Sequence, residues 1–360
     1  MRIEPFKLER WLLEKAEHDL GGGGVMKLQL KDVTTEFDYN QYMKYGRTDG
    51  SESLKRQVAD WCDVDPNNIL ITSGTSEANL LVNLCLIEKG DEYLTEYPQY
   101  EQTSGFAKAL GAKVGAYHLE EENDWRSNLE ELKEKVTRRT RIIFLDNPNN
   151  PTGVLLTKDE MRAFCDIAGD VGAYVHCDNA LRGSEADGKP ASTPFGLYER
   201  GIVTGSISKL GATSPRIGWI IAERELIDRC WVMKDYTTLS HSGLGEYLAE
   251  IILKNRRSYI ERNLAIRRTN TEMMSDWIRE NSDLVSWIRP AAGFTAFPRY
   301  HRRTGSTEFC KRLLEEERIL LSPGDYFGVD KHLRINIGSK REVLAEVLPR
   351  LERFIESLPQ

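Results

Sequence analysis

The chain has 360 residues, of which 40% are hydrophobic, 49 are basic and 56 are acidic, for a formal net charge of −7. This length predicts two lobes or one large domain with a satellite, and the scattered charges argue against a nucleic-acid-binding protein. The six cysteines include no Cys-x-x-Cys pair, which favours reduced thiols over disulfides or a zinc site. We find no apolar stretch of about 18 residues and no signal-like start, so we expect a cytoplasmic protein without a metal.

The expected elements begin with a short amphipathic helix within residues 6–16, followed by four glycines at residues 21–24. Such a run is typical of a flexible linker, or of backbone that passes close to a ligand, because glycine carries no Cβ. From about residue 50, strands and helices alternate, which predicts a mostly parallel sheet covered on both faces. The expected strands are residues 69–72, 92–96, 113–117, 141–145, 173–177 and 202–205, and helices are expected from 75 to 86 and at 128–136, 158–170 and 223–234.

The C-terminal part has a different pattern. A long helical region is expected over residues 243–280, and the strands and helices that follow it are typical of an α+β lobe. We therefore predict an α/β fold with a three-layer α/β/α large domain, residues 46–279, and a smaller α+β domain formed by residues 1–45 with 280–360. The expected elements of the smaller domain are strands at 294–298, 319–322 and 332–337 and helices at 306–317 and 340–357.

Three motifs follow predicted strands, where open parallel sheets bind their ligands. Gly74-Thr75-Ser76 opens a helix, and the backbone N–H groups there either bind an anion or serve as an ordinary helix cap. The two prolines of Asn147-Pro148-Asn149-Asn150-Pro151-Thr152-Gly153 impose a non-helical turn that can aim the Asn150 amide at a ligand oxygen. Asp178 can pair with a protonated pyridine nitrogen, or cap the strand before it.

Two further motifs carry positively charged side chains that can bind a phosphate, an aldehyde or a carboxylate. Lys209 lies in Ser206-Ile207-Ser208-Lys209, and Arg216 follows seven residues later. The lysine amine suits a Schiff base with an aldehyde cofactor whose phosphate is held by Ser206 and Arg216. Arg334, within a predicted strand, is either a residue at the rim or a planar fork for a carboxylate.

In this order and at this spacing, the motifs resemble the class I and II aminotransferases, pyridoxal-phosphate enzymes of fold type I with the aspartate-aminotransferase fold. The resemblance runs from about Tyr45 to the C-terminus. It implies pyridoxal 5′-phosphate (PLP) as cofactor. It also implies that Lys209 forms the Schiff base and transfers the proton, that Asp178 pairs with the pyridine nitrogen, and that Asn150 donates to the phenolic oxygen.

The resemblance also implies roles for the remaining candidates. Tyr100 would stack on the cofactor ring, and Arg334 would bind the substrate α-carboxylate. Tyr45 would reach the phosphate of the neighbouring subunit, which implies a homodimer with shared active sites. Gly23 and Tyr236 are predicted to lie near the substrate. The phosphate-binding residues would be Gly74, Thr75, Ser76, Ser206 and Arg216.

Two positions depart from the family pattern. Leu181 stands where family members commonly carry a tyrosine that hydrogen-bonds the phenolic oxygen, which leaves Asn150 as the main donor. Arg216 follows Lys209 by seven residues, whereas the family usually shows eight.

The leading hypothesis is amino-group transfer between an L-amino acid and a 2-oxo acid. Segments 234–240, 293–299 and 323–328 are also similar to capreomycidine synthase, which has the same fold and cyclises an arginine derivative. The alternative is therefore PLP-dependent elimination or cyclisation of an arginine-like amino acid, for which Glu9, Glu14 and Asp19 offer acids near the entrance.

Two hypotheses from other classes remain. Ser206-x-x-Lys209 also matches the nucleophile motif of penicillin-recognising serine hydrolases, but the Asp-Asn element precedes the serine here and should follow it. A non-enzymatic cofactor-binding regulator would usually carry a DNA-binding module, and residues 1–45 are too short and not basic enough for one.

Overall fold

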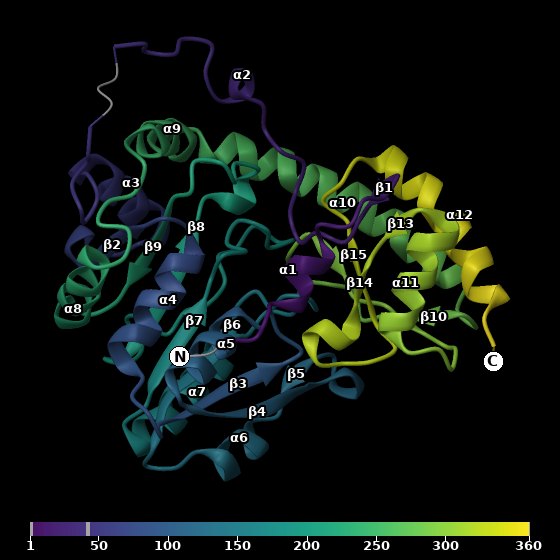
Figure 1. The fold of residues 1–360 in the computed structure, drawn as a ribbon, viewed down its shortest axis with the longest axis horizontal. Coiled ribbons are helices and arrows are strands. Elements are labelled where there is room, and N and C mark those ends of the chain that lie inside the picture. Colours follow the sequence, from purple (N-terminus) through teal and green to yellow (C-terminus); the bar gives the residue numbers. More distant parts are fainter. Residues whose placement is uncertain (1–2, 41–43, 360) are drawn as a thin grey trace.

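The computed structural model describes residues 3–40 and 44–359, and Figure 1 shows two lobes joined by a long helix. The larger lobe contains an eight-stranded sheet in the order β2-β9-β8-β7-β6-β3-β4-β5. The parallel part runs from β8 to β4, whereas β2, β9 and β5 pair antiparallel with their neighbours. The strands are β2 (Ile69–Thr72), β3 (Glu92–Tyr97), β4 (Lys113–Glu120), β5 (Arg126–Ser127), β6 (Thr140–Asp146), β7 (Tyr174–Asp178), β8 (Gly201–Ser206) and β9 (Gly218–Ile221).

Helices cover both faces of this sheet, which confirms the predicted three-layer α/β/α arrangement. Successive strand residues point to opposite faces: Ile69 and Ile71 pack with residues of α3, whereas Leu70 packs with residues of α4 and α8. The helices of this lobe are α3 (Glu52–Cys62), α4 (Thr75–Leu86), α5 (Gln102–Leu110), α6 (Leu129–Lys135), α7 (Lys158–Val171), α8 (Arg224–Asp235) and α9 (Gly243–Lys254).

The helical region expected over residues 243–280 is two helices, because the chain turns at Asn255 between α9 and α10 (Arg256–Glu280). The first part of α10 places Tyr259 in a core cluster of the large lobe, and its last part places Trp277 in the core of the small lobe. One helix thus contributes to both cores, and the predicted domain boundary at residue 279 falls at its C-terminal end.

The small lobe contains short strands packed on two helices, as an α+β lobe should. Its elements are β10 (Val285–Ser286), β11 (Thr295–Ala296), β12 (Arg299–Tyr300), α11 (Ser306–Glu317), β13 (Ile319–Leu320), β14 (Ser322–Pro323), β15 (Leu333–Asn336) and α12 (Arg341–Ser357). Within the described ranges, none of the helices is long and apolar enough to cross a membrane.

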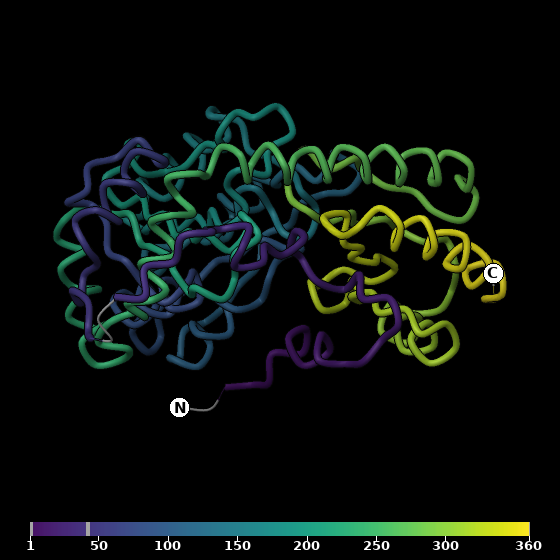
Figure 2. The backbone as a smooth tube through the Cα atoms, turned by 90° about the horizontal axis from the view of Figure 1, so that it is seen from above, coloured from purple at the N-terminus to yellow at the C-terminus, as the bar shows by residue number. Residues whose placement is uncertain are grey.

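The N-terminal segment crosses between the lobes, as Figure 2 shows. Its first helix, α1 (Lys7–Trp11), is shorter than the helix expected within residues 6–16. The segment then joins the small lobe, because β1 (His18–Asp19) pairs with β13 and Leu20 lies in the small-lobe core. It returns to the large lobe through α2 (Leu30–Val33).

Candidate active site

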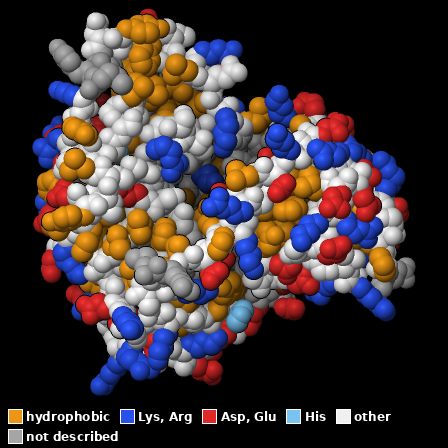
Figure 3. Space-filling model, in the orientation of Figure 1, with side chains coloured by type: hydrophobic (Ala, Val, Ile, Leu, Met, Phe, Trp, Pro, Cys, Tyr) orange, Lys and Arg blue, Asp and Glu red, His pale blue; other side chains and the backbone are white. Residues whose placement is uncertain are grey.

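A cavity of about 190 Å³ lies where the carboxyl ends of β6, β7 and β8 face the small lobe. In Figure 3 the surface is hollowed between the lobes, and Lys or Arg side chains lie inside the hollow. Gly74 precedes two lining residues of α4, and ten predicted site residues line the cavity themselves: Gly23, Thr75, Ser76, Tyr100, Asn150, Asp178, Ser206, Lys209, Arg216 and Arg334.

Lys209 lies in the turn that follows β8. Its Nζ donates a hydrogen bond to the backbone oxygen of Gly23, at 2.7 Å. Burial, together with the charges of Lys27 and Arg334, lowers the pKa of Lys209 to about 8, while the charge of Asp178 opposes the shift. Because the neutral amine is the nucleophile, this shift prepares Lys209 to attack an aldehyde near neutral pH.

The N-terminus of α4 has the features of an anion site. Gly74 has a φ of 86°, and a Cβ there would lie 2.5 Å from a guanidinium nitrogen of Arg216, so the position requires glycine. The Oγ1 atom of Thr75 is buried without a hydrogen-bond partner among the described residues. Ser76 and Ser206 add hydroxyl groups to the same cavity wall. Free helix N–H groups, hydroxyls and a guanidinium together suit a phosphate group.

Asp178 forms the floor of the cavity at the end of β7. Its two carboxylate oxygens accept hydrogen bonds from Asn79 Nδ2, at 2.9 Å, and from the backbone N–H of Ala180, at 2.8 Å. Burial raises the pKa of Asp178, whereas these two donors and the charge of Lys209 lower it. A protonated ring nitrogen beside Asp178 would favour the carboxylate further. Asn79 was not expected at the site from the sequence, although it lies one helical turn after Thr75 and therefore on the same face of α4.

Arg334 is 2% exposed and faces the cavity from β15. Its guanidinium Nη2 donates to the backbone oxygen of Gly21, at 2.6 Å, and its Nη1 donates to Asn150 Oδ1, at 3.3 Å. Burial lowers the pKa of Arg334 to about 10, so it stays charged at neutral pH. Because Arg334 engages its carbonyl oxygen, Asn150 keeps its NH2 group for a ligand. The glycine run therefore passes close to the side chains of Lys209 and Arg334. This fits the interpretation of the run as backbone that passes close to a ligand, and not as a flexible linker.

The family model for class I and II aminotransferases matches residues 22–351. The chain belongs to this family. Capreomycidine synthase from Streptomyces vinaceus is 28% identical, over 98% of this chain and 92% of the relative. An aspartate aminotransferase from Bacillus subtilis is 25% identical, over 96% of this chain and 93% of the relative.

Solved structures agree with this membership. A PLP-dependent aminotransferase from Streptococcus suis superimposes with a TM-score of 0.94 and 32% identity, over all of both chains. The PLP-dependent cyclase OrfR superimposes with a TM-score of 0.90 and 28% identity, over 99% of this chain and 98% of the cyclase. The protein is thus an aminotransferase or a close PLP-dependent relative, and its cofactor is PLP.

The residues of the cavity fit this cofactor. Lys209 offers a buried amine to the aldehyde, and Asp178 offers a carboxylate to the ring nitrogen. The unpartnered hydroxyl of Thr75 and the guanidinium of Arg216 offer contacts to the phosphate. Leu181 also lines the cavity and packs against Val25 and Phe294, so this wall supplies no hydroxyl to the phenolic oxygen.

Tyr100 lies at the cavity wall beside the N-terminal helix. Its hydroxyl donates a hydrogen bond to Glu9 Oε1, at 2.6 Å, and its ring meets Phe6 edge to face. Burial raises the pKa of Tyr100, and the charge of Glu9 raises it further. Of the three acids expected near the entrance, Glu9 lines the cavity, whereas Glu14 and Asp19 do not.

Two predicted site residues lie outside the cavity of their own subunit. The side chain of Tyr45 is 79% exposed and that of Tyr236 is 87% exposed. Tyr45 borders a second hollow, which Leu244 of α9 also lines. Their roles at the active site remain predictions that depend on a neighbouring subunit.

Proposed function

We propose that the protein is a PLP-dependent aminotransferase that moves an amino group between an L-amino acid and a 2-oxo acid. The observation that carries this proposal is the meeting of Lys209, Asp178 and Arg334 in one cavity. When bound, PLP withdraws electrons from the Cα atom of an amino acid, which makes the Cα proton acidic.

Each of these residues has one task in the proposed reaction. Lys209 would hold the cofactor through its amine, and the same amine, once the substrate amine has replaced it, would act as the base that takes the proton from the substrate Cα. Asp178 keeps the ring nitrogen protonated. Arg334 binds the α-carboxylate through two parallel hydrogen bonds, and this orientation makes the proton transfer effectively intramolecular.

A half-reaction tests the proposal. PLP-loaded protein is mixed with each common L-amino acid in the absence of a 2-oxo acid, and cofactor and products are identified by absorbance and mass spectrometry. We expect at least one amino acid to give its 2-oxo acid and an equal amount of pyridoxamine phosphate. The Lys209→Ala variant is the control and should give neither. If every amino acid leaves the cofactor unaminated, transamination is wrong.

A second candidate function is elimination or cyclisation of an arginine-like amino acid. Glu9 favours it, because a carboxylate in the cavity wall can pair with a guanidinium through two hydrogen bonds. The similarity to capreomycidine synthase over 98% of the chain also supports it. In the same half-reaction, this function would consume a basic amino acid while PLP stays unaminated and no 2-oxo acid appears.

We also infer a homodimer with shared active sites. The support is a set of exposed apolar side chains: Tyr45 and Leu244 of α9 line one hollow, and α8 with the loop after it exposes Val232, Tyr236 and Leu239. Soluble monomers rarely expose such a surface without a partner.

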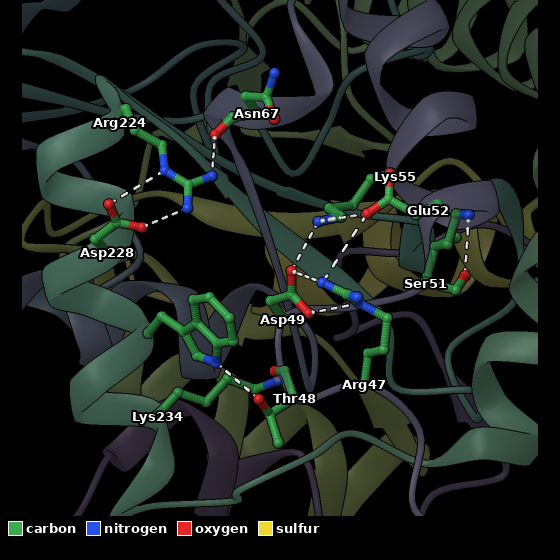
Figure 4. A network of polar contacts seen from close by, with 12 residues as sticks. Arg47, Thr48, Asp49, Ser51, Glu52, Lys55, Asn67, Arg224, Asp228 and Lys234 are labelled. Atoms are coloured by element: carbon green, nitrogen blue, oxygen red, sulfur yellow. Dashed lines mark hydrogen bonds and ion pairs between the residues drawn. The ribbon is translucent and has the colours of Figure 1, made fainter.

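The chain directly after Tyr45 is firmly held, as Figure 4 shows. Asp49 accepts hydrogen bonds from Arg47, at 2.9 Å, and from Lys55, at 2.8 Å. Thr48 Oγ1 accepts from Trp231 of α8, at 2.7 Å. These contacts preorganise the outward position of Tyr45, which supports a role in a neighbouring subunit.

Sedimentation velocity measures this assembly directly. We expect a single species of twice the chain mass, and Tyr236→Glu, which adds a charge to the apolar surface, should shift it toward the monomer. Lys254→Gln, at the last residue of α9, lowers the net charge by the same single unit and should leave the dimer intact. A wild-type protein that sediments as a monomer at micromolar concentration would contradict the dimer.

A further inference from the structure

Asp146 is a second acid at the floor of the cavity. It ends β6, and it lies directly opposite Asp178, the last residue of the neighbouring parallel strand β7. Both acids line the cavity. Asp178 has a hydrogen-bond donor on each oxygen, but Asp146 is only 7% exposed and its Oδ2 atom has no hydrogen-bond partner among the described residues.

The position of Asp146 is set by a buried network. Its backbone N–H donates to Glu96 Oε1, at 2.7 Å, and the same oxygen accepts from Asn149 Nδ2, at 2.7 Å. The backbone groups of Tyr100 and Asn150 interact with the Asp146 carboxyl group itself. The group therefore lies between the two loops that carry Tyr100 and Asn150.

The surroundings of Asp146 decide which of the two acids carries a proton. Two adjacent buried carboxylates repel each other, so the less solvated one is protonated first. The donors of Asp178 engage both of its oxygens. The backbone N–H groups of Tyr100 and Asn150 lower the pKa of Asp146, but they leave its Oδ2 atom without a partner among the described residues. Burial raises the pKa of Asp146 well above its ordinary value, and Asp178 and Glu96 raise it further.

The titratable groups of the described residues that lie near Asp146 on β3, β4 and β7 supply no positive charge. Burial raises the pKa of Glu96 to about 8. It also raises the pKa of Tyr93 on β3, of Tyr117 on β4 and of Cys177 on β7, so these groups are neutral at neutral pH. They leave Asp146 as a neutral acid with an O–H group to donate.

We propose that Asp146 contacts the cofactor and donates a hydrogen bond to the phenolic oxygen of bound PLP. The inference rests on the assignment of the cavity as the PLP site. In the PLP ring, a methyl-bearing carbon separates the ring nitrogen from the carbon that carries the phenolic oxygen. With the ring nitrogen at Asp178 and the phenolic oxygen at Asn150, that oxygen is the hydrogen-bond acceptor on the edge of the ring between these two residues. Asp146 thereby replaces the donor that Leu181 cannot supply.

The test is a pH titration of the visible absorbance band of the Lys209–PLP bond. A donor to the phenolic oxygen stabilises the phenolate and lowers the pH midpoint of the band. Asp146→Leu removes the donor and should raise the midpoint by about one pH unit. Asp146→Asn keeps an N–H donor of the same shape and should titrate like the wild type. Glu185→Gln, at a buried acid outside the cavity lining and outside this network, is the matched control and should leave the midpoint unchanged.

Thermal unfolding with and without PLP separates a cofactor contact from a purely structural role. A structural role lowers Tm equally in both forms, whereas a contact also reduces the gain in Tm that PLP gives to Asp146→Leu. An unchanged midpoint in Asp146→Leu, or an equal shift in Asp146→Asn, would overturn the inference. A wild-type protein without any visible band would instead refute the PLP site itself.

Discussion

Replacing Lys209 by alanine is expected to lower kcat by about 10⁴-fold. It should also remove the visible band of PLP-loaded protein. The variant lacks both the amine that attaches the cofactor and the base that moves the proton. Stopped-flow absorbance and a steady-state assay measure the two losses separately. A band that survives in Lys209→Ala would show that the cofactor is attached elsewhere.

The pH dependence of attachment provides a control for this prediction. Because burial lowers the pKa of Lys209 to about 8 and the neutral amine attacks, the rate of PLP attachment to the apoprotein should rise with pH and level off above about 8. Lys27→Ala is the matched variant, since Lys27 lies outside the cavity lining but its charge lowers the pKa of Lys209. It should keep the visible band and shift this profile to higher pH.

Replacing Arg334 by lysine is expected to reduce kcat/KM for amino acids by about 10- to 100-fold, mostly through KM. Lysine keeps the positive charge and a donor for the Gly21 carbonyl, but it loses the planar fork that binds a carboxylate through two hydrogen bonds. Steady-state kinetics over a range of substrate concentrations measures the change.

Amines that lack a carboxylate show whether Arg334 acts on the substrate. Their kcat/KM should be equally low in wild type and Arg334→Lys. Arg299→Lys is a matched control in the same lobe, because Arg299 pairs with Glu121 at 3.3 Å and does not line the cavity. If Arg334→Lys impairs these amines as much as amino acids, Arg334 stabilises the fold and does not bind the carboxylate.

The large lobe was predictable because its signals are local. Short apolar runs ended by glycine, proline and asparagine predict strands, and the parallel arrangement brings the ends of those strands together. For this reason the positions of Asn150, Asp178 and Lys209 at one cavity followed from the sequence. β9 was missed because its four residues give no period that distinguishes a strand from the adjoining loop.

Contacts between distant parts of the chain could not be predicted. Glu9 was expected near the entrance from the sequence, but its hydrogen bond with Tyr100 was not, because it joins the N-terminal segment, which β1 attaches to β13, to a loop of the large lobe. Asp146 could not be recognised from the sequence either, because an acid at the end of a strand is common. Its distinguishing feature is an Oδ2 atom without a hydrogen-bond partner among the described residues, which only the structure shows. Tyr236 lies on the surface of its own chain, so its predicted role near a substrate would require the proposed partner subunit.

The glycine run has a mechanical consequence. Hydrogen bonds on both sides of Gly23, from Asn336 to Leu20 and from Met26 to Gly338, attach this segment to the small lobe. Lys209 belongs to the large lobe, so its hydrogen bond to the Gly23 oxygen joins the two lobes across the cavity. When the Lys209 amine binds another group, this hydrogen bond to Gly23 is lost. One of the hydrogen bonds that join the two lobes, beside that from Thr295 to the Pro151 oxygen, therefore depends on the occupancy of the site.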